Sequence, residues 1–289
     1  MSHPMRSLVL LPLVVSASGC AGPGAAGRAL SIRLVGGPTA ILELGGVRLL
    51  TDPTFSAPGD YPAAPGRVLT KLEGPAVAVD ALGPIDAVLL SHDQHVDNLD
   101  PAGRAVVARA PLTLSTPEAA RRLGGGVVGL RPWESATVRG RDGRTVRVTA
   151  VPAQHGPDDT EHLTGPVTGF LVDGEGLPTV YVSGDNASVE VVRAIAARAR
   201  VDVALLFAGA ARSPRLLGDA LLTLDGARAV DVARLLDGAA IVPLHFRGWR
   251  HFTESADALR AAFAAAGLSD RLSLLEPGAS LTLPKTRRP

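Results

Sequence analysis

Cysteine is almost absent from this sequence, because Cys20 is the only one among 289 residues. A single cysteine cannot form a disulfide within the chain, and it excludes a metal site built from several thiolates. Apolar residues make up 46% of the sequence, which is enough for a sizeable buried core. We therefore expect core packing to hold the fold, and any metal ligands to be imidazoles and carboxylates.

An excess of charge of one sign is also missing. Lys and Arg total 29 against 28 for Asp and Glu, and no dense basic block occurs. The electrostatic footprint of a nucleic-acid binder is therefore lacking, and we expect no nucleic-acid partner. Aromatic residues are only 3%, whereas there are 32 glycines and 23 prolines, a composition that suits short strands joined by tight turns.

No apolar run reaches the roughly 18 residues needed to span a bilayer, and the most notable short one is 8–15. It is followed by Ala17-Ser18-Gly19-Cys20, and together they resemble a bacterial secretory leader whose cysteine becomes lipidated. We expect residues 1–28 to be a leader and tether, 29–289 to be the globular domain, and lipidated Cys20 to attach the exported protein to a membrane. A cytoplasmic protein with a misassigned start is the alternative.

Short apolar runs separated by Gly and Pro turns predict many strands with helices between them. We expect a loop over 56–66. Strands are expected at 30–35, 39–44, 47–51, 87–90, 112–115, 136–138, 145–151, 169–173, 179–183, 203–207, 240–244, 272–274 and 280–283. Helices are expected at 75–82, 100–110, 117–123, 189–197, 225–236 and 256–266. This order indicates an α/β protein with two sheets packed together and helices outside, without an interdomain linker.

The predicted strand 87–90 stops abruptly at a polar segment that contains His92, His95 and Asp97. Ligands gather where strands of α/β sheets end, so these three side chains could converge on one ion. Asp97 or Asn98 could instead cap the helix that follows. A polar loop with chance histidines is the alternative explanation.

Other predicted strands end in the same way. His155, Asp185 and His245 each follow a likely buried β run. Four strands that deliver ligands to one edge would form a site of mixed imidazoles and carboxylates, which suits zinc, iron or manganese better than calcium.

Three further motifs occur in a characteristic order after the His-rich segment: Val151-Pro152-Ala153-Gln154-His155, Tyr181-Val182-Ser183-Gly184-Asp185 and Val242-Pro243-Leu244-His245. In this the chain resembles the metallo-β-lactamase superfamily, and within it the group typified by ascorbate-6-phosphate lactonase and the phospholipase D that cleaves N-acylphosphatidylethanolamines. The resemblance implies an αββα sandwich of two mixed β-sheets with outer helices. It also implies one or two ions, zinc or else manganese or iron, and a metal-bound hydroxide that hydrolyses an ester, lactone or phosphodiester of a small molecule or lipid.

When the family's ligands are carried over residue by residue, one metal would be held by His92, the second histidine of the motif and His155. Asp97 and His245 would hold the other, Asp185 would bridge the two and orient the nucleophile, and Asp52 would orient ligands by hydrogen bonding.

The sequence departs from the family pattern His-x-His-x-Asp-His. One extra residue separates His92 from Asp97, and Asn98 replaces the last histidine. Either Gln94 or His95 could be the second ligand, and we prefer His95 because imidazole binds such metals better than an amide does. Because Asn98 is a weak ligand, a non-catalytic metal- or ligand-binding protein with a degenerate second site is the alternative function.

Four residues are further candidates around the site. His251 or Glu254 could reach substrate or the second metal position, although a loop followed by a helix that Thr253 caps would equally explain that segment. His162 could donate a proton to a leaving group, or simply be exposed. Arg212 could pair with an anionic substrate, or be a surface arginine.

Overall fold

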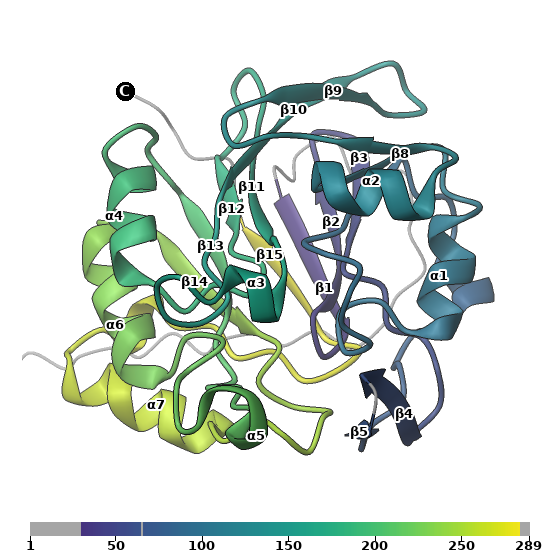
Figure 1. Ribbon diagram of the computed structural model, residues 1–289. Helices are drawn as coiled ribbons and strands as arrows, with labels where there is room; N and C mark the ends of the chain where they lie inside the picture. The colour runs from purple at the N-terminus through teal and green to yellow at the C-terminus, as the bar shows by residue number, and fades with distance from the viewer. Residues whose placement is uncertain (1–29, 65, 284–289) are drawn as a thin grey trace, which may run out of the picture.

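The computed structural model describes residues 30–64 and 66–283, so the predicted leader with Cys20 lies outside the described residues. Two mixed sheets form the centre of the molecule (Figure 1). The first contains seven strands in the order β15-β1-β2-β3-β6-β7-β8. Their bounds are Ser280–Leu283 (β15), Leu30–Gly36 (β1), Thr39–Leu44 (β2), Val47–Thr51 (β3), Ala87–Leu89 (β6), Thr113–Ser115 (β7) and Val127–Gly129 (β8).

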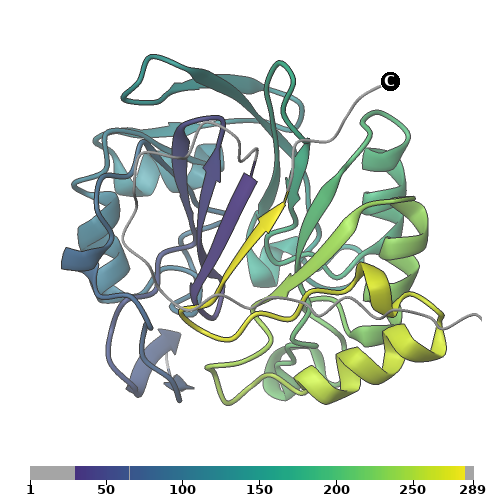
Figure 2. The same cartoon turned by 180° about the vertical axis from the view of Figure 1, so that it is seen from behind.

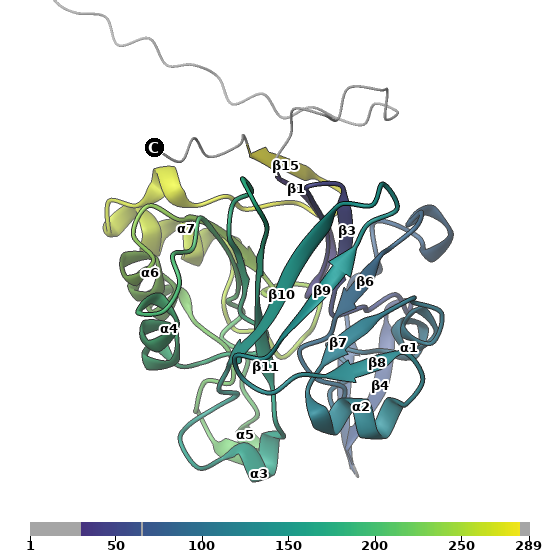
Figure 3. The same cartoon turned by 90° about the horizontal axis from the view of Figure 1, so that it is seen from above.

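The second sheet contains six strands in the order β14-β13-β12-β11-β10-β9. Their bounds are Ala240–Leu244 (β14), Val203–Phe207 (β13), Val180–Val182 (β12), Thr168–Asp173 (β11), Thr145–Pro152 (β10) and Ser135–Arg139 (β9). The two sheets lie face to face when the molecule is seen from above (Figure 3).

Alternating side chains explain why the sheets stack. In β2, Leu42 and Leu44 point into the core between the sheets, whereas Ile41 points to the opposite face. In β13, Leu205 and Phe207 enter that same core, and Leu206 packs under the helices outside. Because successive side chains of a strand point to opposite faces, a continuous apolar run fills both surfaces of a covered sheet.

Helices cover the outer face of each sheet (Figures 1 and 2). On the first sheet these are α1 (Pro101–Val107), α2 (Pro117–Leu123) and the 3₁₀ turn η2 (Val79–Ala81). On the second they are α4 (Val189–Ala196), α6 (Gly226–Leu235) and α7 (Ala256–Ala265), followed by η3 (Ser269–Arg271). None of the helices within the described ranges is long and apolar enough to cross a membrane.

Strand direction brings the ends of several strands to one edge. Strands β12, β13 and β14 are parallel to one another, as are β3 and β6. Strand β10 pairs antiparallel with β11, which pairs antiparallel with β12, so β10 runs in the same direction as β12. The residues that follow β10, β12 and β14 therefore emerge together.

Most predicted elements are confirmed, and the exceptions have physical reasons. The segment 75–82 forms only η2, because the Ala76 N–H bonds to Val35 O of the sheet instead of entering a helix. The segment 272–274 makes only a bridge from Leu272 to Ile241. Ser255 rather than Thr253 caps α7, since the Thr253 hydroxyl donates to Ala210 O. Strand β8 and the short helices α3 (Glu161–Thr164) and α5 (Pro214–Leu217) were not expected.

The loop predicted over 56–66 is wrong in its second half, where a two-stranded hairpin of β4 (Gly59–Ala64) and β5 (Arg67–Lys71) forms. The hairpin is not part of either sheet. It is attached to the loop after β14 by Leu72 N–H to Gly248 O (2.7 Å) and Arg250 N–H to Thr70 O (3.0 Å). Its position next to His251 is therefore fixed by main-chain bonds.

A buried ion pair fastens the base of this hairpin. Lys71 Nζ lies 2.8 Å from Asp100 Oδ2, and the two side chains are 4% and 0% exposed. Asp100 also accepts from the main-chain N–H groups of Phe55, Ser56 and Gly103, and so it caps α1. The N-cap is therefore neither Asp97 nor Asn98, which corrects the capping alternative and leaves both side chains free to face the other sheet.

We predict that Asp100→Ala lowers the free energy of unfolding by about 3–5 kcal/mol, because it leaves the Lys71 ammonium buried without a partner and removes a helix cap. Asp237→Ala, at an exposed position, should change it by less than about 0.5 kcal/mol. Denaturant unfolding of both variants measures the difference. Equal stability of the two variants would contradict the role given to the ion pair.

Candidate metal centre

Two groups of ligand-type side chains meet at the edge where the strands end. The first consists of His92, His95, His155 and Asp185, and the second of Asp97, Asp185 and His245. His95, Asp97, His155 and Asp185 line a pocket of about 520 Å³, and His92 and His245 are fully buried behind it. His92 and His95 come from the loop after β6 of the first sheet, and the other histidines follow β10 and β14 of the second. The site is therefore built across the seam between the sheets.

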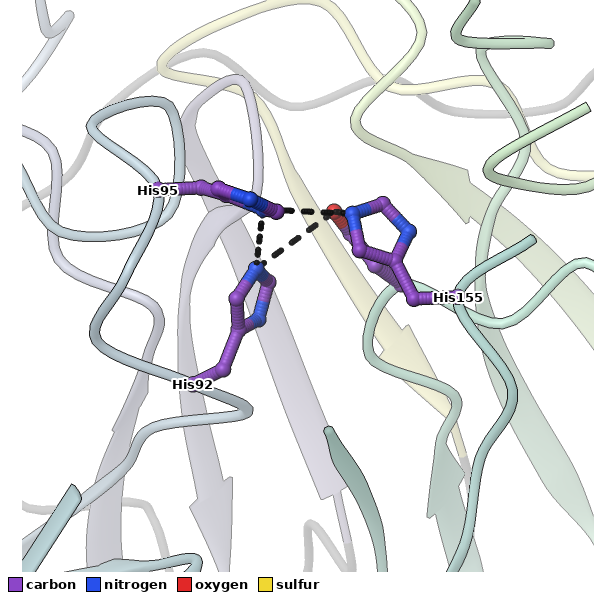
Figure 4. A group of neighbouring side chains, drawn as sticks. His92, His95 and His155 are labelled. Atoms are coloured by element: carbon purple, nitrogen blue, oxygen red, sulfur yellow. Dashed lines mark hydrogen bonds and ion pairs between the residues drawn. The ribbon is translucent and has the colours of Figure 1, made fainter. Parts of the chain in front are cut away.

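Three imidazoles converge in the first group (Figure 4). His95 Nδ1 lies 2.9 Å from His92 Nε2 and 3.2 Å from His155 Nε2. Asp185 Oδ2 closes the group at 3.9 Å from His92 Nε2 and 3.5 Å from His155 Nε2. The structure thus brings His95, and not Gln94, into contact with the other two histidines.

Hydrogen bonds behind two of these rings fix their tautomers. Ser91 Oγ donates to Asp52 Oδ2 (2.7 Å), so it accepts the proton of His92 Nδ1 (2.9 Å). His155 Nδ1 donates to Leu222 O (2.7 Å). Both Nε2 atoms are therefore left with lone pairs that face His95 Nδ1. One proton on His95 can satisfy only one of them.

The second group shares Asp185 with the first. His245 Nε2 lies 3.5 Å from Asp97 Oδ2 and 3.5 Å from Asp185 Oδ1. The two oxygens of Asp185 therefore face different groups, which is the arrangement of a bridging carboxylate. His251 Nε2 lies 3.0 Å from Asp97 Oδ2 and adds an imidazole to this side of the site.

Burial dominates the electrostatics of both groups. It lowers the pKa of His95 to about 3, that of His155 to about 4 and that of His92 well below its usual range. Burial also raises the pKa of Asp185 to about 7. For Asp97 burial is outweighed by the imidazoles of His245 and His251, which hold its pKa well below the usual range. The imidazoles of His92, His95 and His155 are thus neutral at neutral pH and have lone pairs to offer.

The donor set fits metal ions. Buried atoms without a hydrogen-bond partner include His245 Nε2 and Asn98 Oδ1, and unpaired polar atoms of this kind are costly unless something binds them. Ligands at about 2.1 Å from one ion lie roughly 3.0–3.5 Å apart, which is close to most of the separations described above. Imidazoles mixed with carboxylates suit zinc, iron or manganese.

The backbone at the strand ends is strained in order to aim these side chains. Asp52 and His245 have positive φ values of 22° and 54°, which is uncommon for residues with a Cβ. Gly184, with φ of 56°, precedes Asp185 where a Cβ would meet Thr168 O at 2.6 Å and Ser91 Cβ at 2.8 Å. Only glycine fits there, because the two sheets approach each other closely.

Two other predicted residues lie directly behind the ligands. Asp52 accepts from Ser91 N–H (2.6 Å) and from the Ser91 hydroxyl, and burial raises its pKa to about 7. Asn98 Nδ2 lies 3.2 Å from both Asp52 Oδ2 and Asp185 Oδ1. Asn98 therefore connects the orienting carboxylate to the bridging one, through its amide nitrogen.

The remaining candidates are placed differently. Arg212 lines the pocket and donates to Asp219 O. Gln94 turns away to Pro166 O and Arg122. Glu254 accepts from Gly226 N–H (2.7 Å) at the start of α6, and His162 is exposed and bonds to Asp159 O, so the structure brings neither of them to the cluster.

Sequence reasoning missed three residues that shape the site. Ser91 transmits the orientation of Asp52 to His92, and its position directly before the histidine was a usable signal. The carbonyl of Leu222 lies 67 residues from His155, so no local pattern could reveal it. Arg67 lines the pocket from β5, a strand that directly follows the predicted loop 56–66 and was not itself predicted.

Comparison with known proteins gives the class of this one. Residues 47–246 match the family described as Beta-lactamase superfamily domain, and the chain belongs to that family. The predicted resemblance to the metallo-β-lactamase superfamily and the αββα sandwich are thereby confirmed, whereas the narrower group typified by the lactonase and the phospholipase D is not.

One relative is similar in sequence, and solved structures of other proteins share the fold. The chain is 29% identical over 185 residues to a UPF0173 metal-dependent hydrolase from Methanosphaerula palustris, with 61% of this chain and 75% of that protein aligned. Two solved structures share its fold. An isothiocyanate hydrolase from Delia radicum gut bacteria has a TM-score of 0.75 at 21% identity and covers 88% of this chain and 99% of its own. A possible metal-dependent hydrolase from Veillonella parvula has a TM-score of 0.76 at 19% identity. The match covers 89% of this chain and 100% of that protein. The Methanosphaerula and Veillonella proteins are described as metal-dependent hydrolases, in agreement with the predicted enzyme class.

We predict that purified protein contains zinc, manganese or iron by elemental analysis, and that His95→Ala and His155→Ala lose most of it. Each variant removes an imidazole from the point where three of them converge. Gln94→Ala is the matched control in the same loop and should keep its metal. If Gln94→Ala loses its metal and His95→Ala keeps all of it, the second ligand of the motif is Gln94 and not His95.

Proposed function

We propose that this protein is a metal-dependent hydrolase that cleaves an ester, lactone or phosphodiester of a small molecule or lipid. The observation that carries the proposal is the pair of ligand groups that share Asp185 at the floor of a 520 Å³ pocket. Apolar side chains such as Val68, Leu69 and Leu216 line the walls above them and suit the carbon skeleton of such a substrate. The non-catalytic alternative has no comparable support, because the pocket opens onto the ligands.

Each group of residues has a part in the reaction. His92, His95 and His155 would hold one metal, Asp97 and His245 the other, and Asp185 both. A metal ion held there would supply a bound water of pKa roughly 7 and a Lewis acid for the scissile group. Asp185 orients the nucleophile, since its two oxygens face both groups.

His251 and Asp97 form the proton-handling pair. The Asp97 carboxylate is held ionised, and it lies 3.0 Å from His251 Nε2, the distance at which an imidazole N–H donates to a carboxylate. His251 also lines the pocket, so this imidazole is placed to pass a proton to a leaving group.

The test is turnover of a panel of lactones, carboxylic esters and phosphodiesters by protein whose metal content has been measured. We expect at least one class to be hydrolysed, and His251→Gln to lower kcat by about 10²- to 10⁴-fold while the metal content stays unchanged. Exposed His162→Gln is the control and should have wild-type activity.

Two results would contradict the proposal in different ways. Metal-loaded protein that hydrolyses no member of the panel would favour the binding-protein alternative. Loss of metal in His251→Gln would make His251 a ligand rather than a proton donor.

We also propose that the protein is exported and anchored through a lipidated Cys20. This rests on the leader-like sequence, with its apolar run and small residues before the cysteine. Cys20→Ala should release the protein from the membrane fraction of its native host. Wild-type protein found in the soluble cytosol with its first residues intact would rule out export.

A further inference from the structure

Three arginines stand on the walls of the pocket: Arg67 from β5, Arg212 from the loop after β13, and Arg215 from α5. The only acidic residues in the lining are Asp97 and Asp185, which belong to the ligand groups. Within residues 30–64 and 66–283 none of the three arginines forms an ion pair with a carboxylate. The walls of the pocket are therefore cationic, although the chain as a whole is nearly neutral.

Arg67 is the best prepared of the three to bind an anion. Its Nη1 donates to Ser213 Oγ (3.3 Å), which holds one side of the guanidinium against the loop before α5. Its Nε is buried without a hydrogen-bond partner. Nη2 has no hydrogen bond among the described residues and is not buried, so it is the atom that can donate a charge-assisted bond to a carboxylate or phosphate in the pocket.

The position of Arg67 relative to the metal groups is also defined. After burial and His155, the Arg67 charge also contributes to the lowered pKa of His95, so the guanidinium stands near the first group. The hairpin that carries Arg67 is fastened by the Lys71–Asp100 pair and by main-chain bonds to the loop that carries His251. Arg67 therefore stands on an anchored element beside the reacting centre.

We propose that the pocket takes a substrate that carries an anionic group, a carboxylate or a phosphate, remote from the bond that is cleaved, and that the Arg67 guanidinium binds this group through its Nη2. The inference rests on the proposed hydrolase function. Arg67 is a specificity-determining residue, and Ser213 positions it. Arg212 and Arg215 add positive charge to the walls of the pocket, and the proposal assigns neither of them a direct bond to the anion.

The experiment compares two esters that differ in one charge, para-nitrophenyl butyrate and the mono-para-nitrophenyl ester of glutaric acid. Arg67→Gln should lower kcat/KM for the glutarate ester by roughly 10- to 100-fold, which is the value of one charge-assisted hydrogen bond. For the butyrate it should change kcat/KM by less than about twofold, because the metal groups stay intact. Arg67→Lys should restore part of the preference for the anionic ester.

Arg139→Gln is the matched control, because it removes the same charge from an exposed residue of β9 outside the pocket. It should leave the ratio of the two kcat/KM values unchanged. If Arg67→Gln lowers kcat/KM equally for the two esters, or for neither of them, the anion site is overturned while the hydrolase function stands.

Calorimetric titration of metal-loaded protein with glutarate separates the two proposals if neither ester is cleaved. Binding by the wild type that falls at least tenfold in Arg67→Gln would support the anion site while the hydrolase proposal fails for esters. Binding that is absent from the wild type, or unchanged in Arg67→Gln, would overturn the anion site.

Discussion

The burial of three carboxylates at the seam between the sheets is the constraint on which this structure depends. Asp52, Asp97 and Asp185 are only 1–5% exposed and lie near one another. Carboxylates in such a place repel each other and lose their hydration, at a cost of several kcal/mol each unless cations or donors compensate. Donors compensate Asp52, and imidazoles compensate Asp97. The pKa values of Asp52 and Asp185 both rise to about 7, but among the described residues the Asp185 carboxylate accepts a hydrogen bond only from Asn98, so it is the one that most needs a cation.

The residues that surround these carboxylates come from both sheets and from the β4–β5 hairpin, which belongs to neither. Parallel strands end at one edge and supply the ligands, and strained backbone at Asp52 and His245 turns their side chains inward. The β4–β5 hairpin then closes the pocket, held by Lys71 and Asp100. The Asp100 carboxylate, which caps α1, thus also holds in place the hairpin that carries Arg67 and contacts the His251 loop.

The sequence predicted the parts of this site that local patterns encode. Apolar runs located nearly all the strands, and polar residues just after them pointed to His92, His155, Asp185 and His245. The remainder depended on long-range contacts. Asp100 bonds to Lys71 29 residues away, which no helix-capping rule reveals. The hairpin was missed because Gly and Pro suggest turns without saying that two strands will pair between them. The preference for His95 over Gln94 rested on ligand chemistry alone, whereas the structure shows the two side chains turning apart.

One carboxylate shared by two groups has a consequence for how they fill. Oδ2 of Asp185 faces His92 and His155, and Oδ1 faces His245, with Asn98 bonded to that same Oδ1. Ions bound in both positions would share this one carboxylate. The two positions would therefore be thermodynamically linked, and each ion would change the affinity for the other by the same factor. Because Asn98 replaces the last histidine of the family pattern, its hydrogen bond to Asp185 Oδ1 would add to that linkage.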